Sequence, residues 1–182
     1  VLTGTTGPVL GAGIADWLLL TATGPDNTPV RILVEAAALT VEPVVSLDRT
    51  RRSAEVTAHG VRVPASRAVR PGPLPLPDLA ALLAAAEAVG LADWCTRTAA
   101  EYAKVRVQFG RPIGRFQGTK HRCAHMVSRT EQARAAVWDA VQAARTPETA
   151  ALPVAVAAAL ALDAAVDGAK DCIQVLGGIG FT

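Results

Sequence analysis

The chain has 182 residues, of which 51% are hydrophobic and 4% aromatic, and its formal net charge is +2. So small a charge, with so few aromatic rings, excludes the dense basic stripe of a nucleic-acid-binding protein. The length suits one ordinary domain or two small ones. The cysteines at positions 95, 123 and 172 are odd in number and far apart. They predict no disulfide framework or zinc site and indicate a reducing cytoplasm.

Alanine supplies much of the apolar content, and alanine favours helices more than membranes. We find no uninterrupted apolar stretch of the roughly 18–20 residues that a spanning helix needs. The longest candidate, residues 149–166, contains Pro153 and Asp163. We therefore expect no membrane span.

Residues 1–70 predict β-structure. Short apolar runs at 17–22, 30–34 and 41–47 are separated by turn-rich segments. Two more strands are expected on either side of a turn at His59–Gly60. This spacing favours an antiparallel sheet or a partial barrel. Residues 4–16 lack the third glycine of a dinucleotide fingerprint, so we interpret them as a glycine-loosened strand and turn.

Four prolines between residues 70 and 77 predict a stiff linker over residues 71–77, because proline is excluded from helix interiors. Beyond it, helical spacing predicts long helices starting at Asp78, near Phe116 and at Pro147. Short loops between long helices imply an antiparallel bundle. The expected buried faces are Leu79, Leu82, Leu83, Ala86, Gly90, Trp94, Thr98 and Tyr102 on the first helix, and Met126, Val127, Ala133, Val137 and Val141 on the second.

The hinge, Val105 to Gln117, reads VRVQFGRPIGRFQ and joins the first two helices. Its glycines and proline interrupt the helical period, so the backbone must turn there. We expect its two phenylalanines and Ile113 to anchor that turn to a core. Arg106 and Gln117 would then be the polar groups presented. A fixed guanidinium and a fixed amide suit a diphosphate and its ribose.

The third helix ends in the sequence QVLGGIG, residues 174–180. Gly177 is an ordinary helix C-terminal residue that can adopt positive φ. A second adjacent glycine, followed by Gly180, goes beyond what a cap needs. The missing side chains would let this backbone lie against a ligand.

His121 and His125 are four residues apart and could face one metal ion. However, position 122 is arginine, so there is no HExxH motif, and no third ligand is indicated. We interpret the histidines as a partly buried pair in the bundle and predict no metal site. Cys123 is interpreted as a small core residue rather than a nucleophile.

The hinge, the stretch Lys120–Met126 and the tail of residues 174–180 together resemble the acyl-CoA dehydrogenases, in the style of actinobacterial members. The resemblance covers essentially the whole chain. It implies an α+β fold: residues 1–70 as the second part of a middle β-domain, and residues 78–182 as an incomplete up-down helical bundle. It also implies that the chain is a piece of such a protein, without its N-terminal domain and C-terminal end.

What the resemblance implies about ligands is FAD as cofactor and an acyl-CoA as substrate. The FAD contacts would come from Arg106, Phe109, Gln117, Gln174, Gly177 and Gly178. The last three would contact FAD bound mainly by a neighbouring subunit, so we expect a homo- or hetero-oligomer, as dimer or tetramer. The electron acceptor would be an electron-transferring flavoprotein, and the setting the cytoplasm. The basic cluster at residues 49–52 is either solvated or a contact for a CoA phosphate.

Family chemistry removes the proton α to a thioester while the β-hydride passes to flavin, and it needs a carboxylate base. One family position for that glutamate falls near Ala80, which cannot accept a proton, and the other lies beyond Thr182. We therefore name no catalytic residue and expect little or no activity from this chain alone. Three alternatives stay open: an acyl-CoA dehydrogenase, a non-catalytic FAD-binding partner subunit, and a helical scaffold without cofactor.

Overall fold

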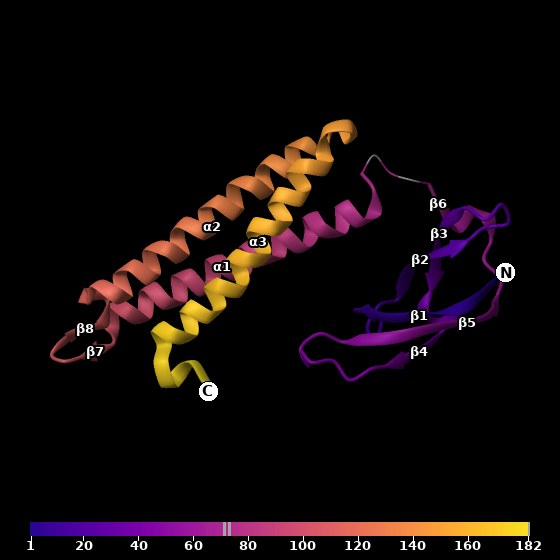
Figure 1. The fold of residues 1–182 in the computed structure, drawn as a ribbon. Coiled ribbons are helices and arrows are strands. Elements are labelled where there is room, and N and C mark those ends of the chain that lie inside the picture. Colours follow the sequence, from indigo (N-terminus) through magenta and orange to yellow (C-terminus); the bar gives the residue numbers. More distant parts are fainter. Residues whose placement is uncertain (71, 73, 182) are drawn as a thin grey trace. The chain divides into compact units, whose positions relative to one another are not determined.

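The structure, a computed structural model, describes residues 1–70, 72 and 74–181, except for the Pro147 side chain. The chain divides into two compact units, Val1–Arg70 and Pro71–Thr182. Figure 1 shows strands in the first unit and long helices in the second. Positions 71 and 73 of the predicted linker, and Thr182 at the end of the predicted bundle, lie outside the described residues.

The first unit contains two antiparallel sheets, each of three strands within its described residues. Their strand orders are β1-β5-β4 and β2-β3-β6. The strands are β1 (Leu2–Leu10), β2 (Trp17–Thr23), β3 (Pro29–Glu35), β4 (Thr40–Pro43), β5 (Ser53–Val61) and β6 (Ala68–Val69). Short 3₁₀ helices, η1 (Ala36–Ala38) and η2 (Ala65–Arg67), precede β4 and β6. The small core of this unit is Ala12, Leu18, Ala54 and Val56.

Two strand predictions were wrong. The turn expected at His59–Gly60 is instead part of the continuous strand β5, where Gly60 has φ +67°. The pairing shifts there by one residue, from Gly4↔Ala58 to Leu2↔Val61, so the glycine accommodates a bulge rather than a reversal. The strand expected over 41–47 ends at Pro43. Pro43 pairs with Ala54, next to the first residue of β5, Ser53, and the rest of the expected strand forms a loop.

The second unit is built from α1 (Leu76–Val105), α2 (Gln117–Ala143) and α3 (Pro147–Leu176). Figure 1 shows α3 returning from the end of α2 and crossing α1. Helix α1 begins two residues before Asp78, which lies in its first turn and places a negative charge at the positive helix end. Proline is tolerated at such a start because its missing N–H has no intrahelical partner to lose. The α3 bounds match the prediction.

The buried faces of the helices consist mostly of alanine. The cluster far from the hinge includes Ala85, Ala92, Ala133, Ala157 and Ala161, each 0% exposed. The cluster near the hinge is Cys95, Ala99, Ala103, Met126, Cys172 and Val175. Small side chains let the helix axes approach closely, which sets the geometry of the bundle.

The predicted buried faces were partly wrong for this reason. Leu83 and Trp94 on α1 are each 63% exposed. The other predicted residues that are exposed are Leu79, Ala86 and Gly90 on α1 and Val127 and Val141 on α2. Alanine recurs on several sides of these helices, so apolar periodicity could not single out the packed side. Leu82, Met126, Ala133 and Val137 are buried as predicted.

A row of arginines on α2 ties it to both neighbours. Asp171 of α3 accepts hydrogen bonds from Arg122 and Arg129. Arg129 also donates to Asp167 at 3.2 Å, and Arg134 donates to Asp93 of α1 at 2.8 Å. The Asp171 side chain is only 16% exposed. The carboxylate of Asp171 therefore joins two guanidiniums in a partly desolvated place, where charge pairing is stronger than at an open surface.

Helices Leu76–Val105 and Glu148–Phe181 are each long and apolar enough to cross a membrane by length and composition. This differs from the expectation that no segment would reach that length. In the 18-residue windows that meet this criterion, 39% and 33% of the residues are buried, and a core helix can meet the same criterion.

Asp171→Asn should lower the free energy of unfolding by about 1–3 kcal/mol, because Arg122 and Arg129 would lose their shared carboxylate. Urea denaturation followed by circular dichroism measures the change. Asp163→Asn is the matched control, since Asp163 lies exposed on the same helix. Equal stability of the two variants would show that the Asp171 contacts with Arg122 and Arg129 contribute nothing to the bundle.

Candidate functional site

The hinge begins where α1 ends. Arg106 caps α1, with its backbone N–H donating to the Tyr102 carbonyl at 2.9 Å. Its own carbonyl accepts from the Ile113 N–H at 2.8 Å, which closes the hinge into a loop. The Arg106 side chain is exposed, so its guanidinium is available to a ligand.

Within this loop, β7 (Val107–Gln108) and β8 (Arg111–Pro112) form a short hairpin. Phe109 and Gly110 at its tip have φ +51° and +76°, as the primed turns of tight hairpins require. Positive φ is rare for a bulky residue, so the tip is conformationally restricted.

The expected anchoring of the hinge by both phenylalanines was wrong for Phe109, which is 91% exposed. The rings of Phe109 and Phe116 form a T-shaped pair with centroids 6.1 Å apart, and the Arg111 guanidinium lies 4.2 Å from the centroid of the Phe116 ring. Ile113 is partly buried against the core near the hinge, as expected. The hairpin turn directs Phe109 away from that core.

The end of α3 lies beside the hinge, and each of its three glycines has a different structural role. Gly177 caps the helix with φ +64°, a conformation that favours glycine. A Cβ on Gly180 would lie 2.9 Å from the Ile173 carbonyl oxygen, so the following 3₁₀ helix η4 (Gly177–Phe181) could not pack there. A Cβ on Gly178 would meet no atom within 4 Å. The fold therefore requires the first and third glycines and leaves open space at Gly178.

Arg106 and the glycine pair line one hollow of about 400 Å³, which we call the glycine hollow. Its lining residues are Tyr102, Arg106, Gln108, Ile113, Val175, Leu176, Gly177, Gly178 and Ile179. The hollow therefore lies between the ends of α1 and α3. It combines the positive charge of Arg106 with the backbone of Gly177 and Gly178, which carries no side chains. That combination is suited to a phosphate group, which can approach peptide N–H groups where no side chain intervenes.

Three of the predicted cofactor residues lie outside this lining. Phe109 is at the hairpin tip, Gln117 is the first residue of α2, and Gln174 lies on the last turn of α3. All three are exposed. Sequence reasoning did not select Tyr102 and Gln108, although both line the hollow. The sequence feature that could have indicated them is their position close to Arg106. Sequence spacing alone, however, does not show which side chains line a hollow.

Other sequence candidates are less suited to a site. His121 and His125 are both exposed rather than partly buried, because they lie on the solvent side of α2. Among the described residues, no three His, Cys, Asp or Glu side chains are grouped to hold a metal ion. In the first unit, the arginines at 49, 51 and 52 border a hollow of about 510 Å³ with Pro43–Ser46 and Ser53.

The cysteines lie together in the core near the hinge. Burial, with Cys172 alongside, raises the pKa of the Cys95 thiol to about 11. Burial also raises the pKa of Cys172, and burial followed by the Asp171 charge raises that of Cys123. Neutral thiols are weak nucleophiles, so these groups behave as small apolar core residues.

The model of the acyl-CoA dehydrogenase C-terminal domain matches residues 78–182. The chain belongs to the acyl-CoA dehydrogenase family. Acyl-CoA dehydrogenase FadE34 of Mycobacterium tuberculosis is 45% identical over 185 residues, covering 98% of this chain and 25% of FadE34. The predicted α+β fold, a partial antiparallel β-domain followed by an up-down helical bundle, is confirmed by solved relatives of this family.

Two solved structures bear on the site. The ChsE4-ChsE5 complex of Mycobacterium tuberculosis matches with TM-score 0.85 and 26% identity, over 99% of this chain and 50% of that chain. PigA, solved with FAD and proline, matches with TM-score 0.84 and 26% identity, over 100% of this chain and 51% of that chain. The chain thus spans a quarter of FadE34 and about half of each solved relative.

Ionisation of Cys95 should destabilise this acyl-CoA dehydrogenase bundle between about pH 9 and pH 11. The folded-state pKa of about 11 lies above the ordinary 9.0, so the stabilisation is complete below pH 9.0 and lost as pH rises through about 11. Urea unfolding at about pH 8 and about pH 11 measures it. Cys95→Ala should show a smaller loss over the same interval, and an identical loss in both proteins would refute the assignment.

Proposed function

We propose that this chain forms one wall of an FAD site in an enzyme that dehydrogenates the α,β bond of an acyl-CoA thioester. The observation that supports this most is the meeting of Arg106 with Gly177 and Gly178 around one hollow. Membership of the acyl-CoA dehydrogenase family supports the reaction class.

The residues of the glycine hollow fit the diphosphate part of FAD. The exposed Arg106 guanidinium supplies a permanent positive charge with several donors, and phosphate oxygens accept from it in pairs. Gly178 offers backbone without a side chain, in a space where a Cβ would meet nothing. When bound, FAD would accept the hydride that leaves the substrate. The role of this chain's residues is to bind and orient the nucleotide end.

The site is open on the helical unit, which supports a second chain as the source of the remaining contacts. Gln117, at the start of α2, and Gln174, on the last turn of α3, are exposed, and amides suit ribose and adenine edges. We propose that the protein is an oligomer in which Gln174, Gly177 and Gly178 contact FAD held mainly by a neighbour. The likeness to the ChsE4-ChsE5 complex supports a heteromer as one form of this assembly.

No residue of this chain is proposed as the catalytic base. Ala80 lies exposed on the first turns of α1, and a methyl group accepts no proton. Asp78 is the nearest acid and already lies in the first turn of that helix. This absence of a carboxylate at Ala80 favours a second candidate function, the non-catalytic FAD-binding subunit of a heteromeric acyl-CoA dehydrogenase.

The arginine hollow of the first unit is a candidate contact for a CoA phosphate under either function, because guanidiniums pair well with phosphates. We further propose an electron-transferring flavoprotein as electron acceptor and the cytoplasm as location. The family resemblance supports the acceptor, and the three free cysteines support a reducing compartment.

Arg106→Ala should weaken FAD retention by the intact protein about tenfold or more, since a charge-assisted contact to phosphate would be lost. Gly178→Val should weaken it too, because the new side chain would occupy space that the fold leaves free. Flavin absorbance per protein after dialysis measures retention. Arg145→Ala, an exposed arginine just beyond the other end of α2, is the control. Full flavin content in both site variants would contradict the proposed site.

An activity assay distinguishes the acyl-CoA dehydrogenase from the non-catalytic partner subunit. Flavin-loaded protein that oxidises an acyl-CoA by itself is a dehydrogenase with its base elsewhere in its own chain. Flavin-loaded protein that is inactive until a second family member is added is a partner subunit. Absence of flavin from the purified wild-type protein would overturn both.

A further inference from the structure

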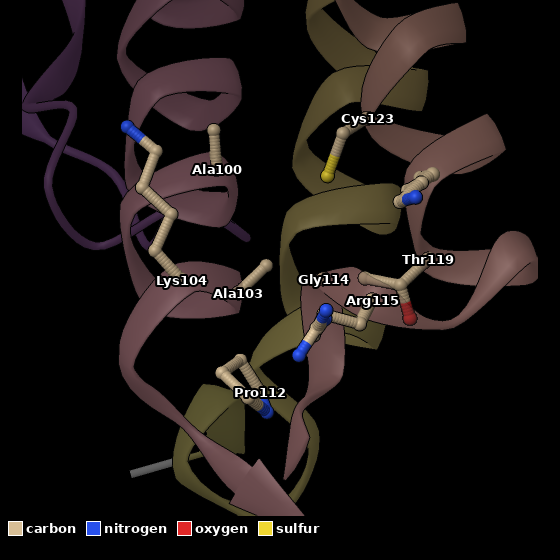
Figure 2. A pocket seen from close by; sticks show the side chains of 9 residues that line it. Ala100, Ala103, Lys104, Pro112, Gly114, Arg115, Thr119 and Cys123 are labelled. Atoms are coloured by element: carbon tan, nitrogen blue, oxygen red, sulfur yellow. The ribbon is translucent and has the colours of Figure 1, made fainter.

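A second hollow lies on a different side of the hinge, where the end of α1 faces the start of α2. It encloses about 440 Å³, within the range of small-molecule sites. We call it the thiol pocket, because Cys123 lines it together with the residues shown in Figure 2. Among its lining residues are none of those around the glycine hollow, so an occupant of one leaves the other open.

The walls of the thiol pocket are predominantly apolar. Ala100 and Ala103 come from α1, Pro112 from the hinge hairpin, and the backbone of Gly114 from the 3₁₀ helix η3 (Ile113–Arg115). Figure 2 shows the Cys123 sulfur pointing into the space between α1 and α2. Its raised pKa keeps this thiol uncharged near neutral pH. The interior therefore suits a hydrocarbon body and would desolvate a multiply charged one unfavourably.

The rim of the same pocket is basic. Lys104, Arg115 and Lys120 line it, with Thr119 as a further hydrogen-bonding group. Lys104 is paired with Glu101 at 2.5 Å. Within the described part of the chain, no ion pair is recorded for Arg115 or Lys120. Two available cations at the edge of an apolar hollow are complementary to a single anionic head group.

We propose that the thiol pocket binds a small amphiphile with one anionic head, of the medium-chain carboxylate class. The hydrocarbon body lies between α1 and α2, and the head contacts Arg115 and Lys120 at the rim. This site is independent of the proposed FAD site, and its occupancy needs neither flavin nor thioester chemistry.

Cys123 provides a readout inside the pocket. It is the half-buried cysteine of the three, and Cys95 and Cys172 are buried. Iodoacetamide treatment of the intact native protein, followed by mass spectrometry of each cysteine peptide, gives the alkylation rate of Cys123. Saturating octanoate should slow that rate about tenfold. Octanol has the same hydrocarbon chain but no carboxylate, and it should protect Cys123 much less. Acetate has the carboxylate without the long chain and should not protect Cys123.

The rim is tested by the double substitution Arg115→Ala/Lys120→Ala. Protection by octanoate should fall to the level given by octanol, because only the apolar contact remains. Arg145→Ala/Lys170→Ala removes the same two charges from exposed positions elsewhere on the helical unit and should leave protection unchanged. Circular dichroism of each variant shows whether the helices are intact.

Several results would overturn the proposal. These are equal protection by octanol and octanoate, unchanged octanoate protection in the rim variant, or equal loss in both double variants. Octyl phosphate distinguishes the head groups: protection no better than octanol assigns the site to carboxylates, and protection equal to octanoate shows that the rim accepts either anion.

Discussion

The close approach of the hinge to the end of α1 is the constraint on which both hollows depend. A Cβ at Gly114 would lie 2.9 Å from the Ala103 carbonyl oxygen, so only glycine allows the hinge to pack this closely against the end of α1. The Ile113 N–H bond to the Arg106 carbonyl then closes the loop. Because the hinge is held there, Arg106 faces the end of α3 and Arg115 faces the start of α2. The hinge thus places Arg106 at the glycine hollow and Arg115 at the thiol pocket.

The bundle around this hinge is held by small side chains and by a few strong polar contacts. Alanines on all three helices are fully buried, while Trp94 and Trp138 are each 63% exposed. Large apolar groups on the outside of a bundle are available to another chain, which agrees with the proposed oligomer. The arginine row on α2, joined to Asp171 and Asp93, fixes the relative rotation of the helices because charged hydrogen bonds demand specific geometry.

The two hollows differ in the chemistry that they can serve. The glycine hollow combines one guanidinium with exposed backbone and fits a phosphate, whereas the thiol pocket combines apolar walls with a basic rim and fits an amphiphilic anion. Neither contains a carboxylate among its lining residues, so the proposed dehydrogenation would take its base from elsewhere. This division agrees with a chain that binds and positions ligands and leaves the acid–base step to another segment or subunit.

The sequence by itself determined the β-then-helix order, the extent of α3 and the family, because proline and glycine positions and motif spacing are local properties. It also indicated Arg106 and the Gly177–Gly178 pair as candidate ligand contacts. Only the tertiary structure decided that these two share a hollow and that Phe109 points outward. Only packing separated Gly180, which the fold needs, from Gly178, which it does not. Alanine-rich helices are apolar on several faces, so the packed side depends on neighbours that no local pattern specifies.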